Sequence, residues 1–322
     1  MMENALDSFK KVTKVVVDSS DFKSLAKFKP IDATTNPSLI IKSINSPHYQ
    51  GIVNRIHKKY SDLKSKEIAR EIVITFAEEI LKVIPGRVSI EVDPSIANNS
   101  SKTEWEAFKI IESCSSRGIP QSKVLIKIPA TWEGITAAKN LEREKINCNL
   151  TLLFSETQAL ACADSGVKMI SPFVGRISDW WRNKGILWDA PFEDPGVKFA
   201  RSVFCHLKKN KYSTEVMAAS FRSVEQVLSL AGLELLTISP KLLSAMMKLP
   251  PQDNIVNWIE EWKNKTFQLF EINQKYEINH HNFSKLMVEN EMANQKLKEG
   301  ITVFKNDGKK LIQAVEAANQ ID

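Results

Sequence analysis

Short apolar runs alternate along the chain with longer stretches that have helical periodicity. The short runs are rich in valine, isoleucine and leucine, and rarely alternate with polar residues, which is typical of strands buried on both faces. They predict eight strands, at 13–18, 32–39, 87–93, 124–128, 148–153, 167–174, 215–220 and 235–238. Between the strands, apolar residues recur at helical spacing, most clearly at Ile68, Ile72, Phe76 and Ile80.

The same periodicity predicts the helices that connect the strands. Their ranges are 22–28, 38–46, 48–60, 65–83, 102–117, 133–145, 156–165, 196–208, 224–230 and 241–248. Further helices are predicted before the first strand, at 3–11, and after the last strand, at 254–270 and 283–318. Gly300 and Asp307-Gly308 are expected to bend the last of these. Segment 176–195 is rich in tryptophan without a clear period, and we interpret it as a long irregular loop.

Strands that alternate with helices predict parallel βαβ units of the α/β class. Eight such units predict a closed (β/α)8 barrel, a TIM barrel, with extra helices at both ends of the chain. The alternative is an open doubly wound sheet, which would require a glycine-rich phosphate loop after an early strand. The chain has 11 glycines and no GxGxxG segment, so the barrel is favoured. We expect one barrel domain over residues 1–322, with the helices of 250–322 packing on the barrel.

Composition narrows the function classes without selecting one. The net charge of +6, from 44 Lys+Arg against 38 Asp+Glu, is too dilute to indicate nucleic-acid binding but suits an anionic substrate. Four widely spaced cysteines without a CxxC pair indicate neither a disulfide framework nor a zinc site. No signal peptide or membrane-length apolar run is visible. We therefore predict a soluble, cytoplasmic protein with no membrane partner.

One residue breaks the apolar pattern of its strand. Lys127 lies between Ile126 and Ile128, in a run that ends at Pro129 and is followed by a helix starting near Thr131. Lysine is rarely fully buried unless it is paired or functional. Burial disfavours the charged ammonium, and a neutral amine is a nucleophile towards carbonyl carbon. The sequence therefore predicts a reactive amine in a dry pocket.

Other polar residues also fall at or just after strand ends, where the active sites of barrels lie. They are Asp18, Asn36, Glu91, Asn149, Thr151, Ser171, Arg176, Ser220 and Arg222. Each has an ordinary alternative role: Asp18 as a helix cap, Asn36 as a turn residue, Thr151 as a strand residue. Together they favour a site, because otherwise several strands would end in unrelated polar residues around one lysine.

These residue types suit Schiff-base chemistry on a sugar phosphate. The Lys127 amine would attack a ketone and form a carbinolamine and then a Schiff base, whose iminium accepts electrons when an adjacent C–C bond breaks. Glu91 and Asp18 are candidate general acids and bases, and Thr151 is a candidate to hold a relaying water. A phosphate would suit the arginines, because guanidinium binds phosphate bidentately. No metal and no cofactor is required.

Seven stretches that contain these residues resemble transaldolase. They are DATTNPSLI (32–40), SIEVD (89–93), VLIKIPATWEGI (124–135), INCNLTLLFS (146–155), ISPFVGRI (170–177), AASFRS (218–223) and LAGLELLTISPKLL (230–243). The resemblance runs from about Val15 to Leu243, more weakly through the C-terminal helices, and is to the longer-chain bacterial and eukaryotic subfamily. It implies a class I Schiff-base transferase of the non-oxidative pentose phosphate pathway. Such an enzyme moves a dihydroxyacetone unit from sedoheptulose 7-phosphate to glyceraldehyde 3-phosphate, giving erythrose 4-phosphate and fructose 6-phosphate.

The resemblance also implies roles for individual residues. Lys127 matches the Schiff-base lysine, Glu91 the carboxylate that works through a water held with Thr151, and Asp18 the acid that handles the C–C cleavage proton. The remaining matches bind substrate: Asn36, Asn149 and Ser171 the dihydroxyacetone hydroxyls; Arg176, Ser220 and Arg222 the phosphate; Phe173 the aromatic wall beside it. A homodimer is the oligomeric state that the resemblance suggests.

The chain departs from the family pattern close to two of the acids. Ser19-Ser20 replaces the usual Thr-Gly after Asp18, and Pro94 follows Asp93 where the family continues with Ala-Arg. Two other functions stay open: a class I aldolase on the same scaffold, which releases dihydroxyacetone to water, and a catalytically silent barrel that acts as a binding protein.

Overall fold

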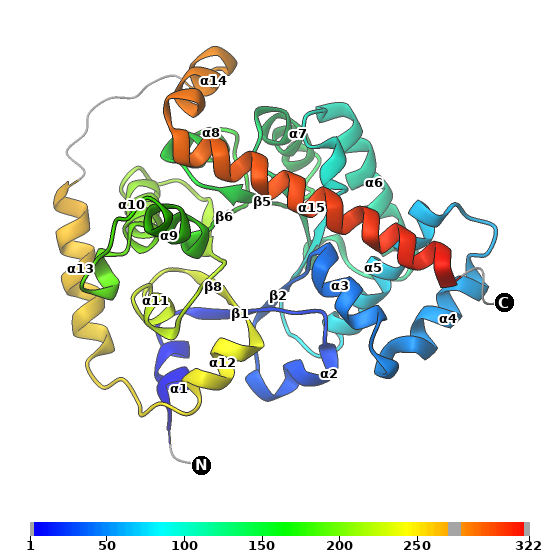
Figure 1. The fold of residues 1–322 in the computed structure, drawn as a ribbon, viewed down its shortest axis with the longest axis horizontal. Coiled ribbons are helices and arrows are strands. Elements are labelled where there is room, and N and C mark those ends of the chain that lie inside the picture. Colours follow the sequence, from blue (N-terminus) through cyan, green and yellow to red (C-terminus); the bar gives the residue numbers. More distant parts are fainter. Residues whose placement is uncertain (1–2, 270–277, 319–322) are drawn as a thin grey trace.

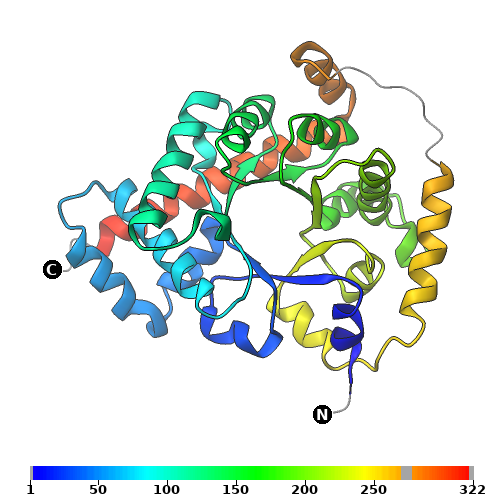
Figure 2. The same cartoon turned by 180° about the vertical axis from the view of Figure 1, so that it is seen from behind.

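The eight predicted strands close into a parallel barrel. The computed structural model describes residues 3–269 and 278–318, and in it each strand pairs with the next and β8 pairs with β1 (Figures 1 and 2). The strands are β1 (Lys14–Asp18), β2 (Asp32–Thr34), β3 (Val88–Glu91), β4 (Val124–Pro129), β5 (Cys148–Leu153), β6 (Met169–Pro172), β7 (Glu215–Ala218) and β8 (Leu235–Ile238). The prediction of a (β/α)8 barrel is confirmed.

Helices surround the barrel and connect its strands. They are α1 (Ala5–Lys10), α2 (Phe22–Leu25), α3 (Pro37–Ile44), α4 (Gln50–Lys59), α5 (Ser65–Leu81), α6 (Ser100–Ser116), α7 (Trp132–Arg143), α8 (Glu156–Asp164), α9 (Val174–Asn183), α10 (Pro195–Lys209), α11 (Val224–Leu228), α12 (Pro240–Met246), α13 (Ile255–Leu269), α14 (His280–Glu289) and α15 (Glu291–Ala318). Polar side chains start several of them: Thr131 accepts the N–H of Gly134 at the start of α7, and Ser155 caps α8. These caps turn the chain sharply from strand end to helix.

Apolar side chains fill both sides of the strands. All residues of β4 and β5 are buried, as expected for strands covered on both faces. A small separate cluster, made of Val16, Leu125, Met169, Met217 and Leu235, comes from the strands alone. Since strand side chains that do not face the helices point into the barrel, this cluster fills the interior and forms a floor beneath the cavity described below.

The predicted irregular loop at 176–195 was wrong over its first part. Helix α9 occupies Val174–Asn183, and a single short 3-10 turn follows at Pro191–Glu193. Val174, Ile177 and Trp180 are all buried and three residues apart, so they form the inner face of this helix. That spacing is present in the sequence, but the neighbouring polar residues and tryptophans conceal it.

The predicted bends in the last helix were also wrong. The chain breaks at Asn290, between α14 and α15, and α15 continues through Gly300 and Gly308. The side chain of Asn290 accepts the N–H of Ala293, as a helix N-cap does. Gly300 has a packing role instead, because a Cβ there would lie 2.7 Å from Cδ2 of Leu152.

Helix α15 lies across one end of the barrel, as the red helix in Figure 1 shows. It contacts α3, α5, α9 and β5, while α13 packs on α10 and α14 packs on α7 and α8. Among the helices of the described residues, none has the length and apolarity needed to cross a membrane.

Candidate active site

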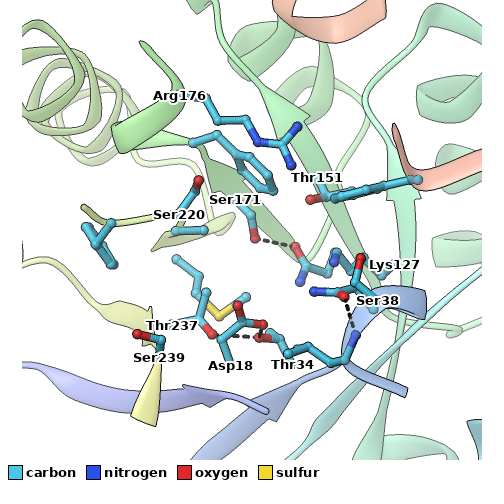
Figure 3. Close-up of a pocket in the computed structure, with 18 of the residues that line it drawn as sticks. Asp18, Thr34, Ser38, Lys127, Thr151, Ser171, Arg176, Ser220, Thr237 and Ser239 are labelled. Carbon is cyan, nitrogen blue, oxygen red and sulfur yellow. Dashed lines mark hydrogen bonds between the residues drawn. The ribbon is translucent and has the colours of Figure 1, made fainter. Parts of the chain in front are cut away.

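A cavity of about 290 Å³ opens at the carboxyl ends of the strands, beneath α15. It is lined by every predicted site residue except Glu91. In Figure 3, Arg176 lies at the top of this cavity and Asp18 at the bottom, with Lys127 at the right and Ser220 at the left. The residues that the sequence predicted from separate strands therefore come together.

Lys127 is the buried amine of this site. It is 5% exposed, and strand pairing places Glu91 on one side of it and Asn149 on the other. Its Nζ lies 3.0 Å from Oε2 of Glu91 and donates a 3.3 Å hydrogen bond to the carbonyl of Thr35. The amine is thus directed by strand register, and a carboxylate is within reach for proton transfer.

Glu91 ends β3 with its side chain only 2% exposed. Burial raises the pKa of its carboxyl, and the charges of Lys127 and Arg176 oppose that rise. Among the described residues, neither Glu91 oxygen has a hydrogen-bond partner of good geometry, and the same holds for Oγ1 of Thr151. Buried oxygens without partners are rare and often mark a functional site or a bound water.

Asp18 ends β1, two strands away from Glu91 around the barrel. Burial raises the pKa of its carboxyl, and Lys127 and a hydrogen bond from Thr34 oppose the rise. Oγ1 of Thr34 donates to Oδ1 of Asp18 at 3.0 Å and shares a 2.6 Å hydrogen bond with Thr237. Thr34 and Thr237 lie on the two strands that flank β1. Neither threonine was predicted as a site residue, because threonine is common in strands and carries no separate signal there.

The amide and hydroxyl groups between the acids are held in fixed orientations. Ser171 Oγ donates to Oδ1 of Asn149 at 2.7 Å, and Nδ2 of Asn149 donates to Oγ of Ser89 at 3.1 Å. Asn36 caps α3 by accepting the N–H of Leu39 at 3.0 Å, and it also lines the cavity. Its predicted alternative role at the turn is therefore correct, and it is compatible with a role in the site.

Two arginines, Arg176 and Arg222, make one side of the cavity cationic. The Arg176 guanidinium lies between two aromatic rings, with its Cζ 5.2 Å from the centroid of Phe173 and 5.2 Å from that of Phe304. Burial, and then the charge of Arg222, lower the pKa of Arg176. Arg222 is more exposed; its Nε and Nη2 donate to Asp179 at 2.9 and 2.7 Å, and its Nη1 to Oγ of Ser220 at 3.3 Å.

The backbone around Arg222 requires a glycine in the neighbouring helix. Ser220 has a left-handed φ of 66°, and its carbonyl accepts the N–H of Gly175 at 2.9 Å. A Cβ at Gly175 would lie 2.2 Å from that carbonyl oxygen and 2.8 Å from Cγ of Arg222. Gln226 fixes the same loop by accepting the N–H of Arg222 at 2.7 Å and donating to Asp194 at 2.8 Å. Sequence reasoning missed Gly175, Asp179 and Gln226, since none carries the chemistry directly.

Helix α15 contributes side chains that the sequence did not indicate. Val303 and Phe304 line the cavity, and Ser38 of α3 donates a hydrogen bond to Asp307. Their only signal is the apolar periodicity of a helix, which does not reveal what the helix covers. Within residues 3–269 and 278–318, no three or more His, Cys, Asp or Glu side chains form a group suited to a metal ion.

The arrangement suits covalent chemistry on an anionic carbonyl compound. It combines a buried amine, two carboxyl groups with raised pKa values, fixed hydrogen-bonding groups and a pair of arginines.

Comparison with known proteins finds matches over most of the chain. The family model described as Transaldolase/Fructose-6-phosphate aldolase matches residues 15–315. A curated protein of Prochlorococcus marinus (strain MIT 9211), named Transaldolase, is 44% identical over 313 residues, covering 94% of this chain and 90% of that protein.

Proposed function

This chain belongs to the transaldolase/fructose-6-phosphate aldolase family and is a transaldolase-type enzyme, and we propose that it works through a Schiff base on Lys127. The donor is sedoheptulose 7-phosphate and the acceptor glyceraldehyde 3-phosphate. The products are erythrose 4-phosphate and fructose 6-phosphate, which is the exchange made in the non-oxidative pentose phosphate pathway.

The observation that carries the proposal is the contact between the Lys127 amine and Glu91, 3.0 Å apart and buried beside the cavity. A buried amine next to a carboxylate can shed and regain its proton without bulk water. Within the described residues, the Glu91 oxygens make no hydrogen bond of good geometry and Oγ1 of Thr151 makes none, so both suit a water that relays this proton. The resemblance assigns the same three residues to this step.

The reaction begins when the donor's phosphate binds Arg176, Ser220 and Arg222. Lys127 passes a proton to Glu91, and its free amine then attacks the ketone carbon C2 and forms a carbinolamine. Glu91, through the water, protonates the departing hydroxyl, which leaves as water, and an iminium remains. Asn36, Asn149 and Ser171 hold the hydroxyls of the dihydroxyacetone unit.

Cleavage then uses Asp18 as the base. It takes the proton of the C4 hydroxyl, the C3–C4 electron pair moves into the iminium, and erythrose 4-phosphate leaves as the aldehyde. A carboxyl with a raised pKa is a better base than an ordinary aspartate, which favours Asp18 for this step. The remaining enamine attacks the aldehyde of glyceraldehyde 3-phosphate, Asp18 returns its proton to the new hydroxyl, and hydrolysis of the iminium releases fructose 6-phosphate.

Product analysis tests the proposal. The purified chain is incubated with fructose 6-phosphate, with and without erythrose 4-phosphate, beside a Lys127→Met control. We expect sedoheptulose 7-phosphate and glyceraldehyde 3-phosphate to accumulate only when the acceptor is present. Free dihydroxyacetone as the main product in both samples would indicate an aldolase instead. Absence of any reaction with folded protein would favour a silent barrel.

The predicted homodimer and the predicted cytoplasmic location stay predictions. Sedimentation velocity of the purified chain measures the first, and fractionation of cells that express it measures the second.

A further inference from the structure

The ring of Phe304, on α15, lies against both cations of the site. Its centroid is 5.4 Å from Nζ of Lys127 and 5.2 Å from Cζ of Arg176. The side chain is 5% exposed and lines the cavity, although it comes from a helix more than 170 residues away from Lys127 in sequence. One aromatic ring therefore touches the proposed nucleophile and a proposed phosphate ligand together.

Packing on either side of Phe304 fixes its position. Gly300, one turn before, packs so closely on β5 that a Cβ there would lie 2.7 Å from Leu152 and 3.2 Å from Nη1 of Arg176. Asp307, one turn after, accepts a hydrogen bond from Ser38. Positions 300, 304 and 307 share one helix face, so both contacts set the register of Phe304.

The barrel strand beneath is shaped to receive this helix. Strand β5 shifts register between Leu150 and Leu153, and Leu152 has a left-handed φ of 57°. That conformation is an outlier for a bulky residue, and such outliers are enriched next to functional sites. It directs Leu152 towards Gly300 of α15, and it comes directly after Thr151 of the proposed site.

The chemistry of an aromatic face suits this position. Its negative quadrupole attracts cations, but it has no lone pair that could take a proton from them. The iminium of the proposed reaction carries its positive charge where the Lys127 ammonium stood. An aliphatic side chain would exclude water equally well, but it would not attract the cation.

We propose that Phe304 is a positioning residue of this reaction, whose ring face supports the cation on Lys127 and orients Arg176. The inference rests on the proposed function. It makes α15 a part of the active site and predicts two separable effects: support of the iminium acts on kcat, and orientation of Arg176 acts on KM for phosphorylated substrates.

Three variants of the full-length chain test the proposal. Phe304→Leu keeps an apolar cover but removes the ring, and Phe304→Tyr restores a ring. Phe283→Leu is the matched control, because Phe283 is also 5% exposed on a C-terminal helix but packs on Trp132, which does not line the cavity. Thermal unfolding is measured for all three, so that loss of packing is compared directly.

We expect Phe304→Leu to lower kcat/KM about tenfold, the effect of losing a partly desolvated cation–π contact. The loss should divide between a lower kcat and a higher KM for fructose 6-phosphate. Phe304→Tyr should recover activity to within about twofold of the parent, by keeping the ring face. Equal losses in Phe304→Leu and Phe283→Leu, or no recovery in Phe304→Tyr, would overturn the proposal.

A second measurement does not depend on Schiff-base chemistry. The chain is labelled with an amine-acylating reagent without sugar, and the modification of Lys127 is followed by peptide mass analysis. Phe304→Ala should increase the labelling rate of Lys127 severalfold and leave that of other lysines unchanged; an unchanged rate at Lys127 would count against the proposal. An active parent enzyme that forms no sugar adduct on Lys127 would instead contradict the proposed function, which separates the two failures.

Discussion

Buried charged side chains are hydrogen-bonded more completely at the amino end of the barrel than at the carboxyl end. At the amino end, Asp32 accepts hydrogen bonds from the backbone N–H, Nε and Nη2 of Arg87 at 2.7, 3.0 and 2.7 Å. Nη1 of the same arginine donates to Glu215 at 2.8 Å. At the carboxyl end, both oxygens of Glu91 lack a hydrogen-bond partner of good geometry among the described residues, and burial raises the pKa of Asp18.

This difference indicates that the charged residues at the amino end serve stability, whereas those at the carboxyl end serve function. The cluster of Asp32, Arg87 and Glu215 joins β2, β3 and β7 with its donors and acceptors satisfied, and a Cβ at Gly86 would lie 2.0 Å from Oδ1 of Asp32. Such a set holds strands together and has little capacity left for a ligand. At the carboxyl end, the buried oxygens of Glu91 and Thr151 keep unused hydrogen-bonding capacity. This is unfavourable in the free protein, but it is available to a substrate.

Removal of the amine should have the largest effect. We expect Lys127→Met to lower turnover by about 10⁴-fold or more, because no other lysine of the described residues lines the cavity to form the proposed Schiff base. The free energy of unfolding should change by only about 1 kcal/mol, because Glu91, whose pKa is already raised, can take up a proton when its partner is lost. Initial rates and urea unfolding measure both. A variant with appreciable turnover would remove Lys127 from the mechanism.

The opposite result is expected at the amino end. Asp32→Asn should lower the free energy of unfolding by about 3 kcal/mol, because it leaves the guanidinium of Arg87 with reduced compensation. Turnover per folded molecule should stay unchanged. Glu261→Gln is the control, since it breaks an exposed pair with Lys265 and should leave the urea midpoint unchanged. If Asp32→Asn lost activity without losing stability, the contrast between the two ends would be wrong.

A smaller effect is expected at the proposed phosphate-binding residues. Arg222→Ala should raise KM for fructose 6-phosphate about 10- to 30-fold and change kcat little, because it removes a charge-assisted contact to substrate. Unphosphorylated fructose should be affected much less. Arg182→Ala removes an exposed arginine that stacks on Trp188 outside the cavity, and it should resemble the parent. Equal losses with both sugars would argue against a phosphate role.

The smallest effect concerns stability as a function of pH. The raised pKa of Asp18 means that the folded state keeps a proton that the unfolded state releases, so Asp18 lowers stability as pH rises from its ordinary value of 3.8 through its folded pKa. Asp18→Asn should therefore raise Tm at pH 7 by about 2 °C, and the gain should disappear near pH 4.

Asp93 supplies the control with the opposite sign. Although burial opposes it, hydrogen bonds from Lys66 and Ser95 lower the pKa of Asp93, so this carboxylate contributes stability that is lost as pH falls. Asp93→Asn should accordingly lower Tm at pH 7, with the loss fading in acid. Parallel Tm–pH curves for the two variants would contradict the view that burial of the Asp18 carboxylate destabilises the folded protein.

The barrel was predictable because local patterns determine it. Each strand, such as 124–128 or 148–153, has the apolar composition of a strand that is buried on both faces. Each helix has apolar residues at helical spacing. Helix α9 was missed because polar residues and a glycine, some of them buried as well, separate the apolar residues of its inner face, Val174, Ile177 and Trp180. The break at Asn290 was overlooked because glycine is the stronger breaker signal, although an asparagine before Glu291 is itself a helix-start signal.

The site was predictable as far as its residues end strands. Lys127 was recognisable because it interrupts an apolar run, and Glu91 because it follows one. Thr34, Gly175 and Phe304 did not, because each acts through a partner far away in sequence: Asp18, Arg222 and Lys127, respectively. No local pattern encodes such contacts, and only the folded chain brings them together.

The most direct test of a Schiff base on Lys127 is borohydride reduction of the chain in the presence of fructose 6-phosphate, followed by peptide mass analysis. We predict a three-carbon adduct on the peptide that contains Lys127, and none in Lys127→Met. Active protein with an adduct on another lysine, or with none, would show that the buried charges at the carboxyl end of the barrel do not serve Schiff-base chemistry.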